Sequence, residues 1–140
     1  MHALVVDDSR AMRAILTRIV AGFGFEVRQA ANGQEALERI AEGPLPDLAV
    51  VDWNMPVMDG LELITAVRAN PSYRDITLMM VTTEAEQSRV VRALAAGAHE
   101  YVIKPFTPDV IEEKLALLGL LPGRGARAAR PATGAARQPA

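Results

Sequence analysis

The stretch VVDWNMPVMDG, from Val50 to Gly60, changes its character at one aspartate. Apolar residues lead up to Asp52, and the segment that follows contains Asn54, Pro56 and Gly60, residue types that favour a loop over a continued strand. A carboxylate at the end of a buried strand is either an exit into solvent or part of a functional site. Which of these applies depends on the other residues that reach the same edge.

Short apolar runs recur along the chain and predict five strands. Ala3–Val6, Leu48–Val51 and Ile76–Val81 are continuous and rich in aliphatic residues, as in strands of a parallel sheet buried on both faces. Phe25–Gln29 alternates between apolar and polar residues, which favours an edge strand. Tyr101–Lys104 is the fifth predicted strand.

Five segments with helical periodicity alternate with these strands. Thr107 is expected to cap the last of them. Strict alternation predicts an α/β fold, a single (βα)5 doubly wound open parallel sheet with right-handed crossovers, whose ligands bind beyond the carboxyl ends of the strands. The recurring apolar positions are Met12, Ile15, Leu16, Ile19 and Val20; Ala36, Leu37 and Ile40; Leu61, Ile64 and Val67; Val90, Val91, Leu94 and Ala95; and Ile111, Leu115 and Leu118.

The composition predicts one domain over residues 1–121 and a Pro, Ala, Gly and Arg tail over residues 122–140, which we expect to be disordered. The tail holds four of the 15 basic residues and none of the 17 acidic ones, so residues 1–121 carry a net charge of −6. An acidic body argues against nucleic acid as a partner. The chain has no cysteine, no secretory signal and no membrane-spanning apolar run, so we expect a cytoplasmic protein.

Polar residues gather at the predicted carboxyl edge of the sheet: Asp7 and Asp8 after the first strand, Asp52 after the third, Thr82 and Thr83 at the end of the fourth, and Lys104 at the end of the fifth. Singly, each has an ordinary structural explanation, such as a helix cap, a strand exit or a surface lysine. Together, three carboxylates in one crevice repel one another. At an effective dielectric near 20, a pair about 4 Å apart costs about 4 kcal/mol.

A compensating cation resolves this repulsion. Lys104 supplies one positive charge, and a hard divalent ion with oxygen ligands, favouring Mg²⁺, would supply the rest. A carboxylate nucleophile, Mg²⁺, a lysine and a hydroxyl in one place are the groups that phosphoryl transfer requires.

Four segments, VVDDSRAMR, DWNMPVMDGLELI, MMVTTEAE and YVIKPFTPDVIEEKL, closely resemble the receiver domains of bacterial response regulators, in particular the single-domain chemotaxis regulators. The resemblance covers about residues 2 to 120. It implies the flavodoxin-like strand order 2-1-3-4-5, which is taken from the family.

The resemblance also implies a phosphoacceptor site. Asp52 would accept a phosphoryl group from the phosphohistidine of a sensor histidine kinase. Asp8 would bind Mg²⁺ directly and Asp7 mainly through water, with Asp52 and the backbone carbonyl of Asn54 completing the protein ligands. Lys104 would pair with the phosphoryl oxygens, followed by the family's cis proline.

Further residues match the family's switch. Thr82 resembles the hydroxyl that turns toward the phosphoryl group, and Tyr101 the ring that rotates inward behind it. Thr83 stands where the most similar regulators have alanine, and its backbone N–H would still serve the phosphoryl group. Asn54 and Glu84 flank the expected path of hydrolytic water and suggest a short-lived phosphoryl state.

These residues predict a stand-alone, monomeric signalling switch that catalyses only its own phosphorylation and dephosphorylation. Its output would be the surface of the fourth helix, fifth strand and fifth helix. The expected partners are a sensor histidine kinase and a downstream protein, for which a flagellar motor switch protein is the best candidate, with a phosphatase as a further one. A phosphorelay intermediate or a kinase-regulating receiver is the alternative.

An enzyme of the haloacid dehalogenase type is disfavoured, because Asp7 and Asp8 are adjacent and do not form the Asp-x-Asp arrangement, and there is no room for a cap domain. A dinucleotide-binding protein would need a glycine-rich turn after the first strand. We expect Trp53 to be a partly exposed ring, and His2 and His99 to be surface residues without a metal or catalytic role.

Overall fold

The computed structural model describes residues 1–121 and alternates strands with helices. The expected α/β architecture is confirmed, whereas the predicted disorder of residues 122–140 lies outside the described residues. No helix within residues 1–121 is long and apolar enough to cross a membrane. The elements are β1 (His2–Val6), α1 (Arg10–Gly22), β2 (Glu26–Ala30), α2 (Gly33–Glu42), β3 (Leu48–Val51), α3 (Gly60–Ala69), the 3₁₀ turn η1 (Pro71–Tyr73), β4 (Thr77–Thr82), α4 (Gln87–Ala96), β5 (Glu100–Ile103) and α5 (Pro108–Leu117).

The five strands form one parallel sheet in the order β2-β1-β3-β4-β5, which confirms the 2-1-3-4-5 order. The register places Val6 beside Val51, and Val51 beside Met80. Residues that follow these positions therefore leave the sheet at one edge. β2 lies at one side of the sheet and is partly exposed, in line with its alternating sequence.

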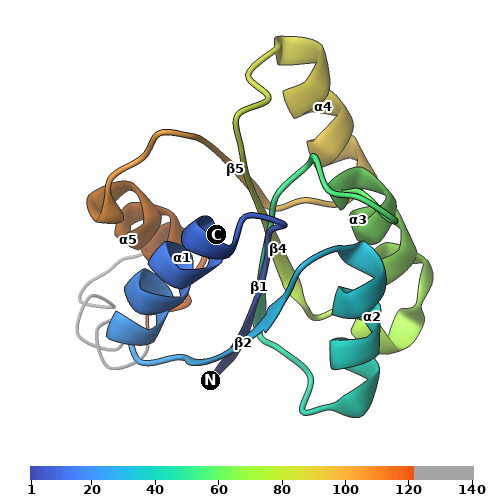
Figure 1. The fold of residues 1–140 in the computed structure, drawn as a ribbon, viewed down its shortest axis with the longest axis horizontal. Coiled ribbons are helices and arrows are strands. Elements are labelled where there is room, and N and C mark those ends of the chain that lie inside the picture. The colour runs from blue at the N-terminus through green and yellow to red at the C-terminus, as the bar shows by residue number, and fades with distance from the viewer. Residues whose placement is uncertain (122–140) are drawn as a thin grey trace.

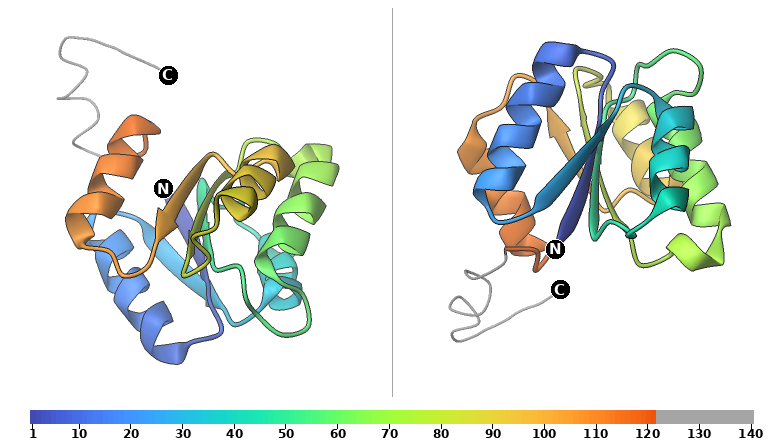
Figure 2. Two further views of the ribbon diagram at one scale, coloured as in Figure 1. Left: turned by 90° about the horizontal axis from the view of Figure 1, so that it is seen from above. Right: turned by 60° about the horizontal axis from the view of Figure 1, so that its bottom comes forward.

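Helices cover both faces of the sheet, with α1 and α5 on one face and α2, α3 and α4 on the other (Figures 1 and 2). Because side chains alternate along a strand, β1 sends Leu4 and Val6 into the core under α2 and α3, and Ala3 and Val5 into the core under α1 and α5. Each large aliphatic side chain buried in this way contributes about 1.5–3 kcal/mol.

Side-chain caps fix where three helices begin. The side chains of Ser9, Asn32 and Asp59 each accept a hydrogen bond from the backbone N–H three residues further on. Such a cap contributes about 1 kcal/mol and fixes the path of the chain from a strand end into the next helix. Thr107 occupies the same position before α5 but makes no capping hydrogen bond with its side chain, so the expected cap is wrong in that respect.

Candidate functional site

Three carboxylates meet at the carboxyl edge of the sheet. Asp7 and Asp8 follow β1, Asp52 follows β3, and one oxygen from each lies within 4.8 Å of the others. The backbone N–H of Asp52 donates to the carbonyl of Val6 at 2.9 Å, which holds the two strand ends together. Asp7 is 1% exposed and Asp52 is 8% exposed, whereas Asp8 lies in solvent. The crowding expected from the sequence is therefore present.

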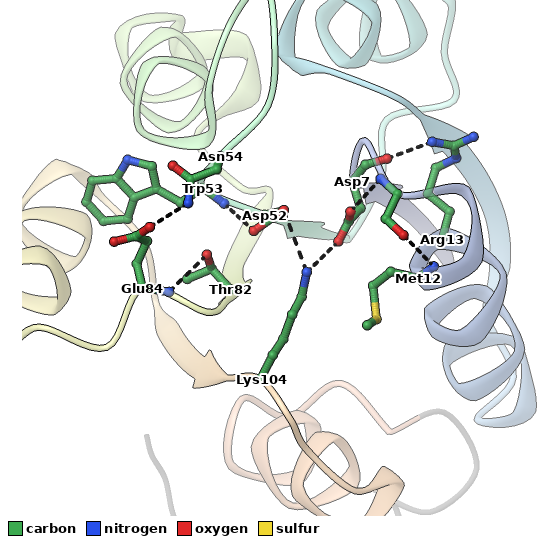
Figure 3. Close-up of polar contacts among 10 residues, drawn as sticks. Asp7, Met12, Arg13, Asp52, Trp53, Asn54, Thr82, Glu84 and Lys104 are labelled. Carbon is green, nitrogen blue, oxygen red and sulfur yellow. Dashed lines mark hydrogen bonds and ion pairs between the residues drawn. The ribbon is translucent and has the colours of Figure 1, made fainter.

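Lys104 reaches into this cluster from the end of β5 (Figure 3). Its Nζ lies 2.8 Å from Asp7 Oδ2 and 3.6 Å from Asp52 Oδ2. The Lys104–Pro105 peptide bond is cis, as the resemblance implies. Within residues 1–121, the ion pairs of the three carboxylates go to Lys104 alone, which leaves two formal negative charges without a partner cation. Oxygen ligands, one exposed carboxylate and this charge deficit fit a hard divalent cation.

The environment of Asp52 opposes its negative charge on balance. Burial raises the pKa of the Asp52 carboxyl above its ordinary value, and the charge of Asp7 adds to that rise. Three groups lower the pKa of Asp52: the Thr82 hydroxyl, the Lys104 ammonium and the backbone N–H of Trp53. The Trp53 N–H donates to Asp52 Oδ1 at 2.8 Å. A desolvated carboxylate beside a cation is a competent nucleophile for an electrophile that enters from solvent.

Thr82 ends β4 beside Asp52 and is fully buried, and its hydroxyl accepts the N–H of Glu84 at 3.4 Å. Tyr101 does not reach Asp52. Its ring is half-buried on β5, and its hydroxyl donates to the backbone carbonyl of Glu84 at 2.5 Å. Burial raises the pKa of the Tyr101 phenol. Thr82 and Tyr101 therefore both contact the loop after β4, Thr82 from the buried side and Tyr101 from the side of β5. Thr83, the first residue of this loop, is exposed.

The outer rim of the site contains contacts that the sequence did not predict. Asn54 Nδ2 donates to Glu84 Oε2 at 2.6 Å, and Arg89 Nε lies 3.6 Å from the other oxygen of that carboxylate. The guanidinium groups of Arg89 and Arg92 lie over the ring of Trp53, 5.2 and 5.9 Å from its centroid. No local pattern links these residues, because α4 lies far from Trp53 along the chain.

Trp53 is 3% exposed, so the expectation of a partly exposed ring is wrong. The ring belongs to the core under α2, α3 and α4, and the two arginines of α4 cover it. His99 is exposed, as expected, but it takes part in a hydrogen-bond network with Arg68 at the opposite edge of the sheet.

The loop between β3 and α3 is shaped by two unusual backbone positions. A Cβ atom on Gly60 would lie 2.1 Å from the carbonyl oxygen of Asp52, so only glycine fits there. Val57 adopts a φ of 70°, a left-handed conformation that a β-branched residue rarely takes, and its side chain is 80% exposed. This tight turn keeps α3 close behind Asp52.

Comparison with known families agrees with this geometry. A family model described as "Response regulator receiver domain" matches residues 3–116, most of the chain. The chain belongs to the response regulator receiver family. Receiver domains of this type are components of two-component signalling systems and are not conventional enzymes. Receiver domains bind Mg²⁺ at an acidic pocket, and Asp7, Asp8 and Asp52 form an acidic cluster at the carboxyl edge of this sheet.

Curated relatives of this receiver include a chemotaxis protein CheY homolog of Campylobacter jejuni, 44% identical over 90% of this chain and 98% of the relative. Chemotaxis protein CheY1 of Helicobacter pylori is 43% identical over 82% of this chain and 94% of the relative. The solved structure of Vibrio cholerae chemotaxis protein CheY4 covers 81% of this chain and 94% of its own, with a TM-score of 0.75 and 35% identity. A CheX-CheY-BeF3-Mg²⁺ complex from Borrelia burgdorferi contributes a chain with a TM-score of 0.77 and 26% identity, over 84% of this chain and 89% of its own.

Proposed function

We propose that the protein is a response regulator receiver whose Asp52 carboxylate accepts a phosphoryl group from the phosphohistidine of a sensor histidine kinase. The observation that carries this proposal is the buried Asp52 carboxylate with Lys104 and Asp7 on one side and the Thr82 hydroxyl on the other (Figure 3). A carboxylate oxygen of Asp52 attacks phosphorus, the phosphorus–nitrogen bond breaks, and the imidazole leaves with the bonding electron pair.

The acidic residues of the pocket would hold Mg²⁺. Asp8 would bind the ion directly, and Asp7 would act mainly through water because its Oδ2 already contacts Lys104. Asp52 and the backbone carbonyl of Asn54 would complete the protein ligands. When bound, Mg²⁺ neutralises charge on the phosphoryl oxygens and the carboxylates. The relative from Borrelia is described in complex with both BeF3 and Mg²⁺.

Three residues would contact the transferred group. Lys104 moves from the carboxylates to the phosphoryl oxygens, a shift that its flexible side chain permits. The Thr82 hydroxyl, now close to the N–H of Glu84, turns toward the phosphoryl group. The backbone N–H of Thr83 donates a further hydrogen bond. Hydrogen bonds to charged groups contribute about 1.5–3 kcal/mol each, and about 5.5 kcal/mol converts a 1:99 equilibrium to 99:1. Two or three such bonds are therefore enough to drive a switch.

The output surface would be formed by α4, β5 and α5. Tyr101 lies on β5 and holds the loop after Thr82 through the carbonyl of Glu84, so movement of Thr82 changes the packing of this ring. Val91, Leu94 and Ile103 are large apolar side chains exposed on α4 and β5, 44–56% accessible, and give a protein partner an apolar contact. The names of the relatives favour chemotaxis. A flagellar motor switch protein is the proposed target. A phosphorelay or kinase-regulating role is the alternative.

Labelling with a small phosphodonor tests the phosphoacceptor. Incubation with acetyl phosphate and Mg²⁺ should add one phosphoryl group per chain, detected by intact mass, and Asp52→Asn or a chelator should prevent it. Continued release of phosphate from an unrelated phosphate ester would instead favour a hydrolase. Labelling that persists in Asp52→Asn would contradict the proposed acceptor.

Thr82→Ala tests the coupling between the phosphoryl group and the surface. Because this variant keeps the Asp52 carboxylate, it should still be labelled by acetyl phosphate. It lacks the hydroxyl that moves, so phosphorylation should no longer increase binding of the motor switch protein in a titration. The matched control is Thr65→Ala, which alters an exposed hydroxyl on α3. Phosphorylation-dependent binding that survives in Thr82→Ala would refute the coupling.

A further inference from the structure

The residues around Asp52 are buried on some sides and border solvent on another. Asp7, Trp53 and Thr82 are at most 3% exposed, so water cannot approach past them. On the open side lie Asn54 and Glu84, whose side chains are joined by a 2.6 Å hydrogen bond (Figure 3). A water molecule that approaches a group on Asp52 from this side passes this amide and carboxylate, and both can orient it.

Arg89 fixes the position of the Asn54 and Glu84 side chains. Its Nε lies 3.6 Å from Glu84 Oε1, while Glu84 Oε2 accepts the Asn54 amide, so the two oxygens of one carboxylate are held from opposite directions. The guanidinium lies 5.2 Å from the centroid of the Trp53 ring. Because that ring is buried, it is a rigid support for the arginine, and a planar guanidinium stacks well on an aromatic face.

We propose that Arg89 is a positioning residue for hydrolysis of the phosphoryl group on Asp52. This inference rests on the proposed phosphoacceptor function. In the step concerned, a water oxygen attacks phosphorus and the bond from phosphorus to the Asp52 carboxylate oxygen breaks. The Asp52 carboxylate is regenerated, one proton of the water stays on the inorganic phosphate, and the other passes to the solvent. Arg89 acts through Glu84 and contacts none of the reacting atoms.

Without Arg89, the Glu84 carboxylate is held by the Asn54 amide alone and is free to rotate into solvent. The attacking water then loses part of its orientation, and hydrolysis slows. Arg92 provides a matched comparison. Its guanidinium lies over the same Trp53 ring at 5.9 Å, but within residues 1–121 it forms no ion pair with Glu84.

The test follows the decay of phosphorylated protein after acetyl phosphate is removed in the presence of Mg²⁺, with phosphate-affinity electrophoresis as the readout. Arg89→Ala should slow the first-order decay by about two- to fivefold, the range expected for a partly exposed ion pair. Arg92→Ala should leave the rate constant unchanged, and Arg89→Lys should give an intermediate value. The effect of Arg89→Ala should disappear in a Glu84→Ala background.

An unchanged rate constant in Arg89→Ala would overturn the inference. So would a slowing of the same size in the Glu84→Ala background, because the arginine would then act through general stability or through Trp53. Circular dichroism verifies that each variant is folded. If Arg89→Ala unfolds, the decay rate of Arg89→Lys is compared with that of the unaltered chain instead. Failure of the proposed function is distinguishable, since the unaltered chain would then not become labelled at all, and the inference would fall with it.

Discussion

The two edges of the parallel sheet hold a basic side chain in opposite ways. At the carboxyl edge, Lys104 contacts two of three crowded carboxylates, and negative charge remains in excess. At the amino edge, Arg68 of α3 donates to the backbone carbonyls of Gly97, Tyr73, Arg74 and Ile76 and contacts Nδ1 of His99. There the partners are neutral and fixed by the backbone.

The comparison separates a structural cluster from a functional one. Arg68 joins the end of α3 to the starts of β4 and β5, and its network is satisfied within the protein. Lys104 stands in an arrangement that is incomplete without an added cation or anion. A folded protein tolerates such an arrangement at the place where it binds something. The amino edge is expected to be rigid and the carboxyl edge to be responsive.

Removal of Arg68 should have the largest effect on stability. Arg68→Ala leaves several carbonyls without a donor and opens the space beside Gly97, so the free energy of unfolding should fall by about 2–4 kcal/mol. Urea denaturation measures this change. Arg74→Ala, which removes an exposed arginine side chain from the same region, should stay within about 0.5 kcal/mol of the unaltered chain. Equal effects of the two substitutions would contradict the structural role of Arg68.

Asp52→Asn should act in the opposite direction at the other edge. Burial raises the pKa of Asp52, so this group favours the folded state below the ordinary aspartate pKa and loses that contribution as pH rises through the folded pKa. At neutral pH the ionised carboxylate therefore lowers stability, and the neutral amide of the variant removes that penalty.

The expected gain without metal is about 1–2 kcal/mol in the free energy of unfolding. The melting temperature should also lose most of its response to Mg²⁺. Thermal unfolding with chelator and with Mg²⁺ measures both effects, and Asp75→Asn serves as the control at an exposed aspartate. A variant less stable than the unaltered protein in chelator would show that the carboxylates are not in conflict.

Val57→Gly should produce a smaller gain. The left-handed conformation of Val57 costs on the order of 1–3 kcal/mol, and glycine removes that strain while adding freedom to the unfolded chain. The net stabilisation should be about 1 kcal/mol by urea denaturation. Val57→Ala keeps most of the strain and should gain less. Equal stability of the two variants would argue against strain at this position.

The pH dependence at the amino edge should be the smallest effect and of opposite sign to that of Asp52. Burial and the charge of Arg68 lower the pKa of His99, whose Nδ1 accepts the N–H of Leu78 at 3.1 Å. A lowered histidine pKa means that the contribution to stability is present above the unfolded pKa and is lost as pH falls through the folded value.

His99→Gln should therefore reduce the loss of unfolding free energy between roughly pH 7 and pH 5, a range set by the ordinary histidine pKa. Urea denaturation across that range provides the measurement. An unchanged slope in the variant would mean that other groups carry the pH dependence.

The sequence alone determined the architecture and the location of the site. Continuous apolar runs alternating with helical periodicity specify a parallel sheet covered on both faces, and parallel strands necessarily direct their carboxyl ends to one edge. Asp7, Asp52 and Lys104 each stand directly after such a run, so strand direction places all three at one edge. The strand order that brings them close together was implied by the family resemblance.

Tertiary structure alone decided the contacts that depend on packing between distant elements. How α4 lies against the sheet determines the burial of Trp53 and its contact with Arg89. It also determines the ion pair between Arg89 and Glu84. The network of Arg68 likewise joins α3 to carbonyls in two other segments, one between η1 and β4 and one after α4. A local pattern encodes which face of an element is buried, but it does not encode which side chain from another element will lie against that face.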